Sequence, residues 1–185
     1  IVQHTFGNMV DMAKVKSIVD KANLGRNPER KIYIIEDCAH IFTKNTDSLN
    51  IGKYSDVYFF SFSQDKSISC TEGAAMIIND KKIRKIASNK YKDIKKLTKR
   101  EAKYNARYII LWNLIKKTYF KRVIPFSNIT VGRILIILLR SLGIIKRQAS
   151  ENTLLFTEPQ RMSNIQAALL LNQIKKLFAY SRIRH

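Results

Sequence analysis

The sequence predicts an α/β fold in which helices pack on a mainly parallel sheet. Three apolar runs rich in β-branched and aromatic residues, at 31–35, 56–62 and 74–78, have the length of buried strands. A segment with helical spacing at 8–22 separates the first run from a short strand at 1–6, and this order is typical of a sheet with crossover connections. Hydrophobic residues make up 45% of the 185 residues, which is enough to build a core.

The first eighty residues contain these strands in order. The strand at 1–6 ends at Gly7, and the helix after it has an apolar face made of Met9, Met12, Val15, Ile18, Val19 and Ala22. A turn at 23–30 leads to the run 31–35, which is capped by the acids Glu36 and Asp37. The strands at 56–62 and 74–78 follow a polar stretch around Gly52.

From Lys81 onward the pattern is helical. Apolar residues recur at helical spacing in 81–97, 106–120 and 131–145, with Pro125 between the last two, and again in 161–178. We therefore predict three parts: an α/β core at 1–80, a basic helical insert at 81–150 and a return helix at 151–185. Because the chain begins at Ile1 and ends inside a helical pattern, we expect it to be part of a longer protein.

The positive charge is concentrated in the insert. The formal net charge is +20, and residues 81–150 hold 20 of the 34 lysines and arginines but only two acids, Asp93 and Glu101. Three interpretations are open: a solvated helical hairpin, a surface for anionic membranes, or a nucleic-acid binder. The last is the weakest, because the segment matches no recognised nucleic-acid motif.

Cysteine usage and the first residues bear on the compartment. Cys38 and Cys70 form no disulfide framework and fit a reducing environment. The spacing of Cys38 and His40 is not that of zinc ligands, so no metal is predicted. The first twenty residues have no basic start followed by an apolar stretch, so we expect a cytoplasmic protein with a possible peripheral membrane contact.

Two charged residues follow apolar strands at positions where α/β proteins commonly bind ligands. Asp37 comes at the end of one strand and Lys66 follows another, and open α/β sheets bind ligands at the carboxyl ends of their strands. A structural ion pair is one explanation. The other is pyridoxal 5'-phosphate, which needs a lysine amine, a carboxylate beside its ring nitrogen and hydroxyl donors for its phosphate, such as Ser61 and Ser63.

Three stretches resemble successive motifs of the DegT-type nucleotide-sugar aminotransferases: YIIEDCAHIF, GKYSDVYFFSFSQDKSISCTEGAAMIIND and RMSNIQAALLLNQIKKL. The segment QHTFGNMVDM also resembles the strand and turn before the first helix of that family. The resemblance covers about 1–80 and 160–180. It implies the large domain of a fold type I, pyridoxal-phosphate-dependent enzyme, with 1–80 as its cofactor-binding core.

Site residues are carried over by position in these motifs. Lys66 resembles the lysine that bonds covalently to the cofactor, and Asp37 resembles the partner of the ring nitrogen. His40 takes the place of a His or Gln that lies against the cofactor, and Ser61 matches a serine that helps to bind the phosphate. The resemblance also implies a homodimer that transfers an amino group, usually from glutamate, to a nucleotide-linked keto sugar in cell-surface polysaccharide or glycoconjugate biosynthesis.

The chain departs from the family pattern at three positions. Thr71 and Ala74 replace glycines of the turn after Lys66, and Pro159 stands where the family often has an Asn that reaches the neighbouring subunit's phosphate. The upstream portion and the small C-terminal domain are expected to lie outside this chain, so residues 1–185 alone are expected to be inactive. These departures favour an alternative, a non-catalytic scaffold or polyanion-binding or membrane-surface module on the same fold, which the intact Asp37, Ser61 and Lys66 oppose.

Overall fold

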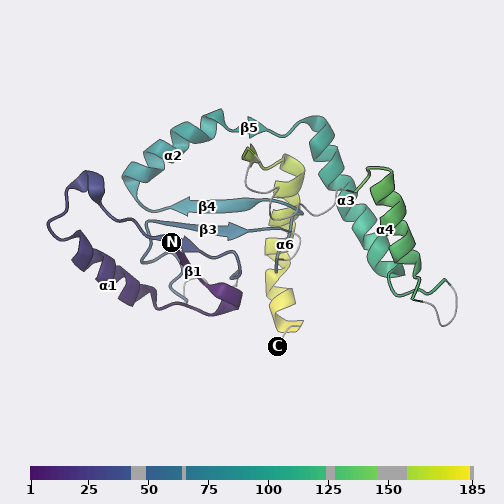
Figure 1. Ribbon diagram of the computed structural model, residues 1–185, viewed down its shortest axis with the longest axis horizontal. Coiled ribbons are helices and arrows are strands. Elements are labelled where there is room, and N and C mark those ends of the chain that lie inside the picture. The colour runs from purple at the N-terminus through teal and green to yellow at the C-terminus, as the bar shows by residue number, and fades with distance from the viewer. Residues whose placement is uncertain (43–48, 64–65, 124–127, 146–157, 184–185) are drawn as a thin grey trace. The chain divides into compact units, whose positions relative to one another are not determined.

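The computed structural model describes residues 1–42, 49–63, 66–123, 128–145 and 158–183 (Figure 1). The chain divides into two compact units, one made of residues 1–94 and 167–185 and the other of residues 95–166. Two features of the predicted organisation, the break at Pro125 and the boundary at residue 150, lie outside the described residues.

The first unit contains a four-stranded sheet. Its strands are β1 (Val2–Gln3), β2 (Ile35–Asp37), β3 (Val57–Ser61) and β4 (Ala74–Ile78), in that spatial order. The first three are parallel to one another, and β4 runs antiparallel to β3. The predicted α/β class with a mainly parallel sheet is therefore confirmed, and the predicted strand at 74–78 has the bounds of β4.

Three predicted strands have different bounds in the structure. The strand predicted at 56–62 is one residue shorter at each end, since β3 covers Val57–Ser61. The run at 31–35 contributes only its last residue to β2, whereas Glu36 and Asp37, which were expected to cap it, lie within the strand. The reason is the hydrogen bonding of Ile34. Its N–H donates to the Asp56 carboxylate, and its C=O accepts from the N–H groups of Asp56 and Val57. The ladder with β3 therefore begins one residue later, at Ile35. The first strand is also shorter than predicted, because residues 5–7 form a 3-10 turn.

The crossover between β1 and β2 is made by helix α1 (Met12–Asn23). The prediction placed its start at residue 8, but Asp11 is the N-cap, since its carboxylate accepts from the N–H of Lys14 at 3.1 Å. Only Met12 of the predicted apolar face is fully buried, while Met9 and Ile18 are exposed.

The helices after β4 begin at side-chain caps. Asp80 caps α2 (Lys81–Asp93), Thr98 and Glu101 form a capping box at the start of α3 (Lys99–Thr118), and Thr130 caps α4 (Val131–Ser141). The capping box explains why α3 begins at Lys99, seven residues before the predicted start.

Residues 94–97 and 160–163 are not helical, although the predicted helices include most of them. Instead β5 (Lys95–Lys96) pairs in parallel with β6 (Gln160–Arg161), and α6 (Asn164–Ile183) begins after β6. Within the described parts of the chain, no helix has the length and apolar content needed to cross a bilayer.

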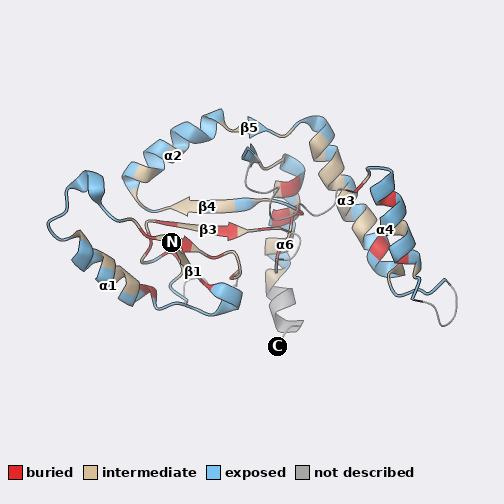
Figure 2. Cartoon of the chain, viewed as in Figure 1, coloured by how far each residue is buried: buried red, intermediate tan, exposed pale blue. Residues whose placement is uncertain are grey.

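The second unit is organised around the antiparallel pair α3 and α4 (Figures 1 and 2). Its buried residues are Ile115, Leu139 and Ile145, with Trp112 and Tyr119 packed against them. Gly132 lies against the C-terminal end of α3, because a Cβ atom there would stand 2.5 Å from the Cα of Tyr119, the residue that follows this helix. This glycine therefore decides which side of α4 faces α3.

Candidate functional site

Two predicted site residues lie on one face of the sheet at its carboxyl edge. β2 ends at Asp37 and the parallel neighbour β3 ends at Ser61, so both strand ends reach the same edge. Asp37 pairs with Phe59, and side chains alternate between the faces along a strand, so Asp37, Phe59 and Ser61 share a face. His40 and Lys66 lie in the loops that leave this edge, three and five residues after the two strands.

This face of the sheet is open beside the two residues. On β4, Met76 pairs with Phe59 and Ala74 pairs with Ser61, so both lie on the face of Asp37. Met76 is 59% exposed and Ala74 is also exposed, whereas Asp37, Ser61 and Lys66 are half-buried. The strand ends therefore present a carboxylate and a hydroxyl beside an apolar, accessible surface.

The carboxylate of Asp37 is oriented by its own loop. Its Oδ1 accepts a hydrogen bond from the N–H of Ala39 at 2.9 Å. A bond of this kind, from a backbone N–H two residues ahead to an Asp side chain, closes an Asx turn. The turn determines where the chain leaves β2 and where His40 stands.

The ring of His40 is held by Phe6, a residue in the turn that follows β1. Its Nδ1 accepts from the N–H of Phe6 at 3.1 Å, and the two rings stack with centroids 5.5 Å apart and planes 16° from parallel. Because Nδ1 accepts, a neutral His40 carries its proton on Nε2. Phe6 has a φ of 54° and Gly7 one of 84°, so the turn that brings Phe6 to His40 uses left-handed backbone.

Behind this edge lies a buried pair, His4 and Glu36, that no sequence motif indicated. Nε2 of His4 is 2.9 Å from Oε1 of Glu36, and both side chains are completely buried. The N–H of Val10 donates to Nδ1 of His4, so the proton of His4 is on Nε2 and points at Glu36. Gly52 donates its N–H to the other carboxylate oxygen of Glu36 at 3.0 Å.

Glu36, the neighbour of Asp37 in β2, connects three segments of the chain through its hydrogen bonds. His4 follows β1, Glu36 is in β2 and Gly52 precedes β3, so one carboxylate ties together the segments that set the position of Asp37. The available signal was a glutamate beside Asp37 in a strand whose register makes every second side chain face inward. His4 carried no such signal, because its contact is with a residue 32 positions away.

His4, Glu36 and Cys38 form a buried cluster with the residue types of a metal site. Their potential ligand atoms lie within 4.8 Å of one another. Both nitrogens of His4 and both oxygens of Glu36 already take part in hydrogen bonds. Burial, together with the negative charges of Glu36 and Asp37, raises the pKa of the Cys38 thiol to about 12, so this group is a neutral thiol at pH 7. The cluster is a hydrogen-bonded network.

Hydrogen bonds hold the loop that carries Lys66 at its base, where it leaves β3, and near Ser69, where it contacts α6. The N–H of Phe62 donates to the carbonyl of Gly73 at 2.8 Å, and the N–H of Cys70 donates to the carbonyl of Phe62 at 3.1 Å. On the far side, the amide of Gln173 in α6 accepts from the N–H of Ser69 at 3.1 Å and donates to the Ser69 carbonyl. The α6 motif thus supports the lysine loop, a contact between residues 104 positions apart that no local pattern predicts.

Thr71 adopts a conformation that suits glycine. Its φ is 78°, in the left-handed region where a β-branched side chain is strained, and its buried hydroxyl has no hydrogen-bond partner among the described residues. By the family resemblance this position carries a glycine. Thr71 replaces it but keeps a left-handed backbone of the kind that glycine adopts without strain. The strain lies five residues from Lys66.

Replacement of Thr71 by glycine should stabilise the protein. Left-handed backbone costs roughly 1–2 kcal/mol for an L-residue, and a buried unpaired hydroxyl costs about 1–3 kcal/mol. The greater conformational entropy of glycine in the unfolded chain offsets about 0.5–1 kcal/mol of this stabilisation. We expect Thr71→Gly to raise the free energy of unfolding by about 1–4 kcal/mol, measured by urea denaturation. Ser67→Gly, in the same loop at an exposed position without a positive φ, is the control and should be slightly destabilising; a loss of stability in Thr71→Gly would contradict the strain.

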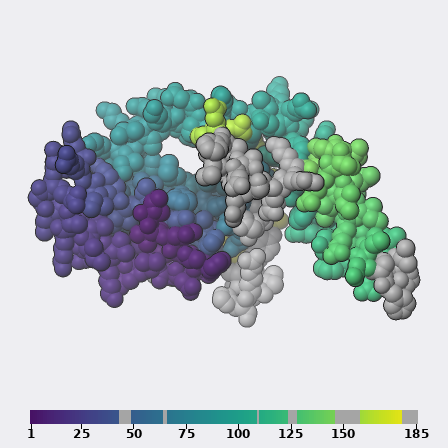
Figure 3. Space-filling view, viewed as in Figure 1, coloured from purple at the N-terminus to yellow at the C-terminus, as the bar shows by residue number. Residues whose placement is uncertain are grey.

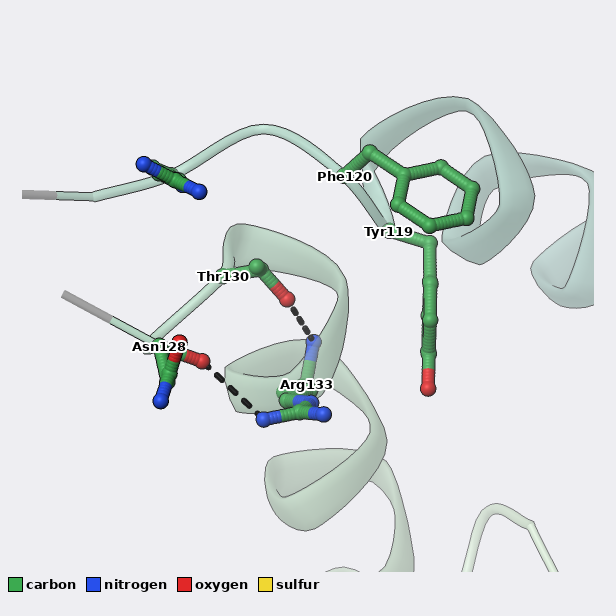
Figure 4. Close-up of a pocket in the computed structure, with 6 residues that line it drawn as sticks. Tyr119, Phe120, Asn128, Thr130 and Arg133 are labelled. Atoms are coloured by element: carbon green, nitrogen blue, oxygen red, sulfur yellow. Dashed lines mark hydrogen bonds between the residues drawn. The ribbon is translucent and has the colours of Figure 1, made fainter. Parts of the chain in front are cut away.

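The second unit contains a pocket of about 350 Å³ at the start of α4 (Figure 4). It is lined by Tyr119, Phe120, Arg122, Asn128, Thr130 and Arg133. Nη1 of Arg133 donates to the carbonyl of Asn128 at 3.0 Å, and its backbone N–H donates to the Thr130 hydroxyl. None of the four predicted site residues lines this pocket.

Comparison with known proteins connects the chain to a family. The pattern of the DegT/DnrJ/EryC1/StrS aminotransferase family matches residues 1–109, more than half of the chain. The GDP-perosamine synthase of Escherichia coli O157:H7 is 31% identical over 78 residues, which are 42% of this chain and 19% of that protein. The GDP-perosamine synthase of Vibrio cholerae is 29% identical over 76 residues, 41% of this chain and 18% of the relative.

One further relative and one solved structure have other descriptions. The lipopolysaccharide biosynthesis protein RfbH of Salmonella typhimurium is 28% identical over 86 residues, which are 46% of this chain and 18% of that protein. The X-ray structure of the aminotransferase from Psychrobacter cryohalolentis superposes with a TM-score of 0.47 and 22% identity, over 94% of this chain and 32% of that one. The matches span about a fifth of the length of the curated relatives. The match includes the first two of the three predicted motifs and ends before the third, at 161–177. The predicted family is confirmed: the chain belongs to the DegT/DnrJ/EryC1/StrS aminotransferase family.

Proposed function

We propose that this chain forms part of a pyridoxal-phosphate-dependent aminotransferase that moves an amino group from an amino acid, by resemblance glutamate, to a nucleotide-linked keto sugar. The observation that carries the proposal is the placement of Asp37 and Ser61 on one open sheet face, with the Lys66 loop leaving the same edge. The sugar substrate is supported by relatives described as GDP-perosamine synthases. A role in cell-surface polysaccharide or glycoconjugate biosynthesis is supported by the relative described as a lipopolysaccharide biosynthesis protein.

The residues present fit pyridoxal 5'-phosphate. The open face beside Phe59 and Met76 would take its planar ring, and Asp37 would pair with the ring nitrogen. Ser61, whose hydroxyl lies 3.4 Å from that of Ser63, would donate to the phosphate, and Lys66 would hold the cofactor covalently. His40, with its ring fixed by Phe6, would lie against the cofactor.

Lys66 would also act as the general acid and base. Its amine removes the proton from the α-carbon of the amino donor and returns a proton to the neighbouring reacting carbon. Asp37 keeps a proton on the ring nitrogen by charge-assisted hydrogen bonding. When bound, the cofactor supplies the electron sink that makes this proton removable. The backbone hydrogen bonds at the base of the Lys66 loop would fix the loop from which the amine reaches these carbons.

The proposal extends to partners and location. The family resemblance supports a homodimer, with Pro159 lacking the donor by which an Asn would reach the neighbour's phosphate. We also propose a cytoplasmic protein that contacts anionic membrane surfaces from one side through residues 81–150, supported by the charge of that segment.

Covalent labelling of the full-length protein tests the assignment. Borohydride reduction should link pyridoxal phosphate to one lysine, and peptide mapping by mass spectrometry should identify it as Lys66. Lys53→Ala, which removes a lysine from the segment before β3, is the matched control and should leave the label in place. A label on another lysine would contradict the assignment of Lys66. No label in the cofactor-saturated protein would contradict the proposal and favour the non-catalytic scaffold.

A further inference from the structure

Helix α4 has two apolar faces, and α3 covers only one of them. The covered face contains Gly132 and Leu139, which are buried, and Leu135 and Ile136, which pack against the core of the helix pair. The other face is apolar and open: Ile134 is 46% exposed, Ile137 68% and Leu138 53%. Val131 and Leu142, at the two ends of the helix, are exposed as well.

These exposed residues form a continuous strip. We call Val131, Ile134, Ile137, Leu138 and Leu142 the open strip. At about 100° per residue, the five side chains occupy roughly 140° of the helix circumference. Arg133 and Arg140 are seven residues apart, so they lie together beside the open strip, and α4 contains no acidic residue. Figure 3 draws atoms of α4 in green at the surface turned to the viewer.

The outer face of α3 mixes apolar and positive side chains. Ile110 and Leu114 are exposed, and helical spacing places them in line with Lys103, Arg107 and Lys117. The described residues between 95 and 145 include twelve lysines and arginines and one acidic residue, Glu101, which gives a formal net charge of +11. A ligand for this unit must therefore offer an apolar phase and negative charge together.

We propose that α4 lies in the plane of an anionic membrane, with the open strip among the acyl chains and Arg133 and Arg140 at the lipid phosphates. This inference deepens the membrane contact of the proposed function, on which it rests, by naming the inserting element. Helices that lie at the membrane surface combine such an apolar face with basic residues at its border. At about 1.5 Å per residue, the eleven residues of α4 extend roughly 16 Å, which suits a helix lying in the interface.

Charge distinguishes a lipid surface from other occupants of the open strip. A second copy of this unit would bring another charge of +11 to the contact, which opposes association. Nucleic acid would neutralise the charge but would offer no apolar phase for Ile134, Ile137 and Leu138. An anionic bilayer satisfies both requirements.

Vesicle flotation with the full-length protein tests the inference. Vesicles of equal parts phosphatidylglycerol and phosphatidylcholine should bind the protein, and phosphatidylcholine vesicles should bind it at least about 10-fold more weakly. The affinity for the anionic vesicles should fall between about 0.1 and 1 M salt, because the Debye length shrinks from about 10 to about 3 Å. Equal binding to both vesicle types would overturn the inference.

Matched variants separate the apolar from the charged contribution. Substitution of Ile134, Ile137 and Leu138 by glutamine should lower the affinity at least about 100-fold, because the three side chains lose their burial among acyl chains. Ile18→Gln, at a 66% exposed position on α1, is the apolar control and should change little. Arg133→Gln with Arg140→Gln should cost about 20-fold, and the exposed Arg30→Gln is its charge control.

A tryptophan reports the depth of insertion. Ile137→Trp should show a blue-shifted emission that brominated lipids quench, whereas Ile18→Trp, with the same background from Trp112, should not. Quenching of both variants or of neither would overturn the placement of α4.

Other occupants give other results, each of which overturns the inference. Binding to duplex DNA without binding to vesicles would indicate nucleic acid. A triple glutamine variant that changes the oligomeric state would indicate a second copy, and one that lowers the thermal midpoint without vesicles would indicate that another part of the protein covers the strip. Labelling of Lys66 by cofactor, measured on the same variants, should persist, so failure of the membrane contact and failure of the aminotransferase proposal are distinguishable.

Discussion

Lys66→Ala in the full-length protein is expected to lower the rate of amino transfer by about 10²–10⁴-fold, because general acid–base catalysis by a positioned side chain typically contributes this much. Lys66 is proposed to move the proton in both directions. The loss should appear in the rate constant of a single-turnover assay, which separates the chemical step from product release. Small primary amines added to the solution should restore part of the rate, because they can carry the same proton.

The matched control is Lys21→Ala, which removes an exposed lysine from the last turn of α1. This variant should keep the wild-type rate. A Lys66→Ala protein with near-normal turnover would show that Lys66 is structural and that the carboxyl edge of β2 and β3 is not the catalytic centre. A loss that amines do not restore, together with an altered circular dichroism spectrum, would assign the effect to folding.

Glu36→Leu is expected to lower the free energy of unfolding by about 4 kcal/mol, because each buried donor left without a partner costs about 1–3 kcal/mol. The leucine removes the acceptor of two buried donors, Nε2–H of His4 and the N–H of Gly52. His4 cannot adapt by moving its proton to Nδ1, because the N–H of Val10 points at that nitrogen. At about 2–4 °C per kcal/mol for a domain of about 150–250 residues, the thermal midpoint should fall by roughly 10 °C.

Glu29→Leu is the control for Glu36→Leu, since Glu29 is an exposed glutamate in the turn before β2. It should leave the thermal midpoint nearly unchanged. A Glu36→Leu protein as stable as the Glu29→Leu protein would mean that the His4–Glu36 pair contributes little to the sheet. The cofactor spectrum of Glu36→Leu should also change at temperatures where the protein is folded, because Glu36 adjoins Asp37 in β2.

Local pattern was sufficient to predict which segments form the sheet but was less reliable on their bounds. The strands at 56–62 and 74–78 are recognisable because β-branched and aromatic residues fill them. β2 was displaced in the prediction because the apolar run 31–35 ends before the strand does, and its bounds depend on pairing with β3. The β5–β6 pair was missed because four charged or polar residues from distant segments form it.

In the candidate site, too, local pattern predicted the residues themselves but not the distant contacts that support them. Asp37, His40, Ser61 and Lys66 were predicted from motif and position, and the structure places Asp37 and Ser61 on one face at the edge expected for them. Their support was not predictable: Phe6 holds His40, His4 holds Glu36, and Gln173 holds the Lys66 loop. Each contact joins residues more than thirty positions apart, and a pattern that repeats every two or four residues contains no information about such partners.

The sequence by itself determined the chemical groups available to this protein and the segments that carry them: a lysine and a carboxylate after apolar strands, and a basic segment of helices. Only the tertiary structure decided which faces those segments bury. α4 is apolar on nearly all sides, and it is the approach of Tyr119 to Gly132 that turns Leu139 inward and leaves Ile134, Ile137 and Leu138 in solvent. The physical reason is that burial is a property of a pair of surfaces, whereas periodicity describes only one of them.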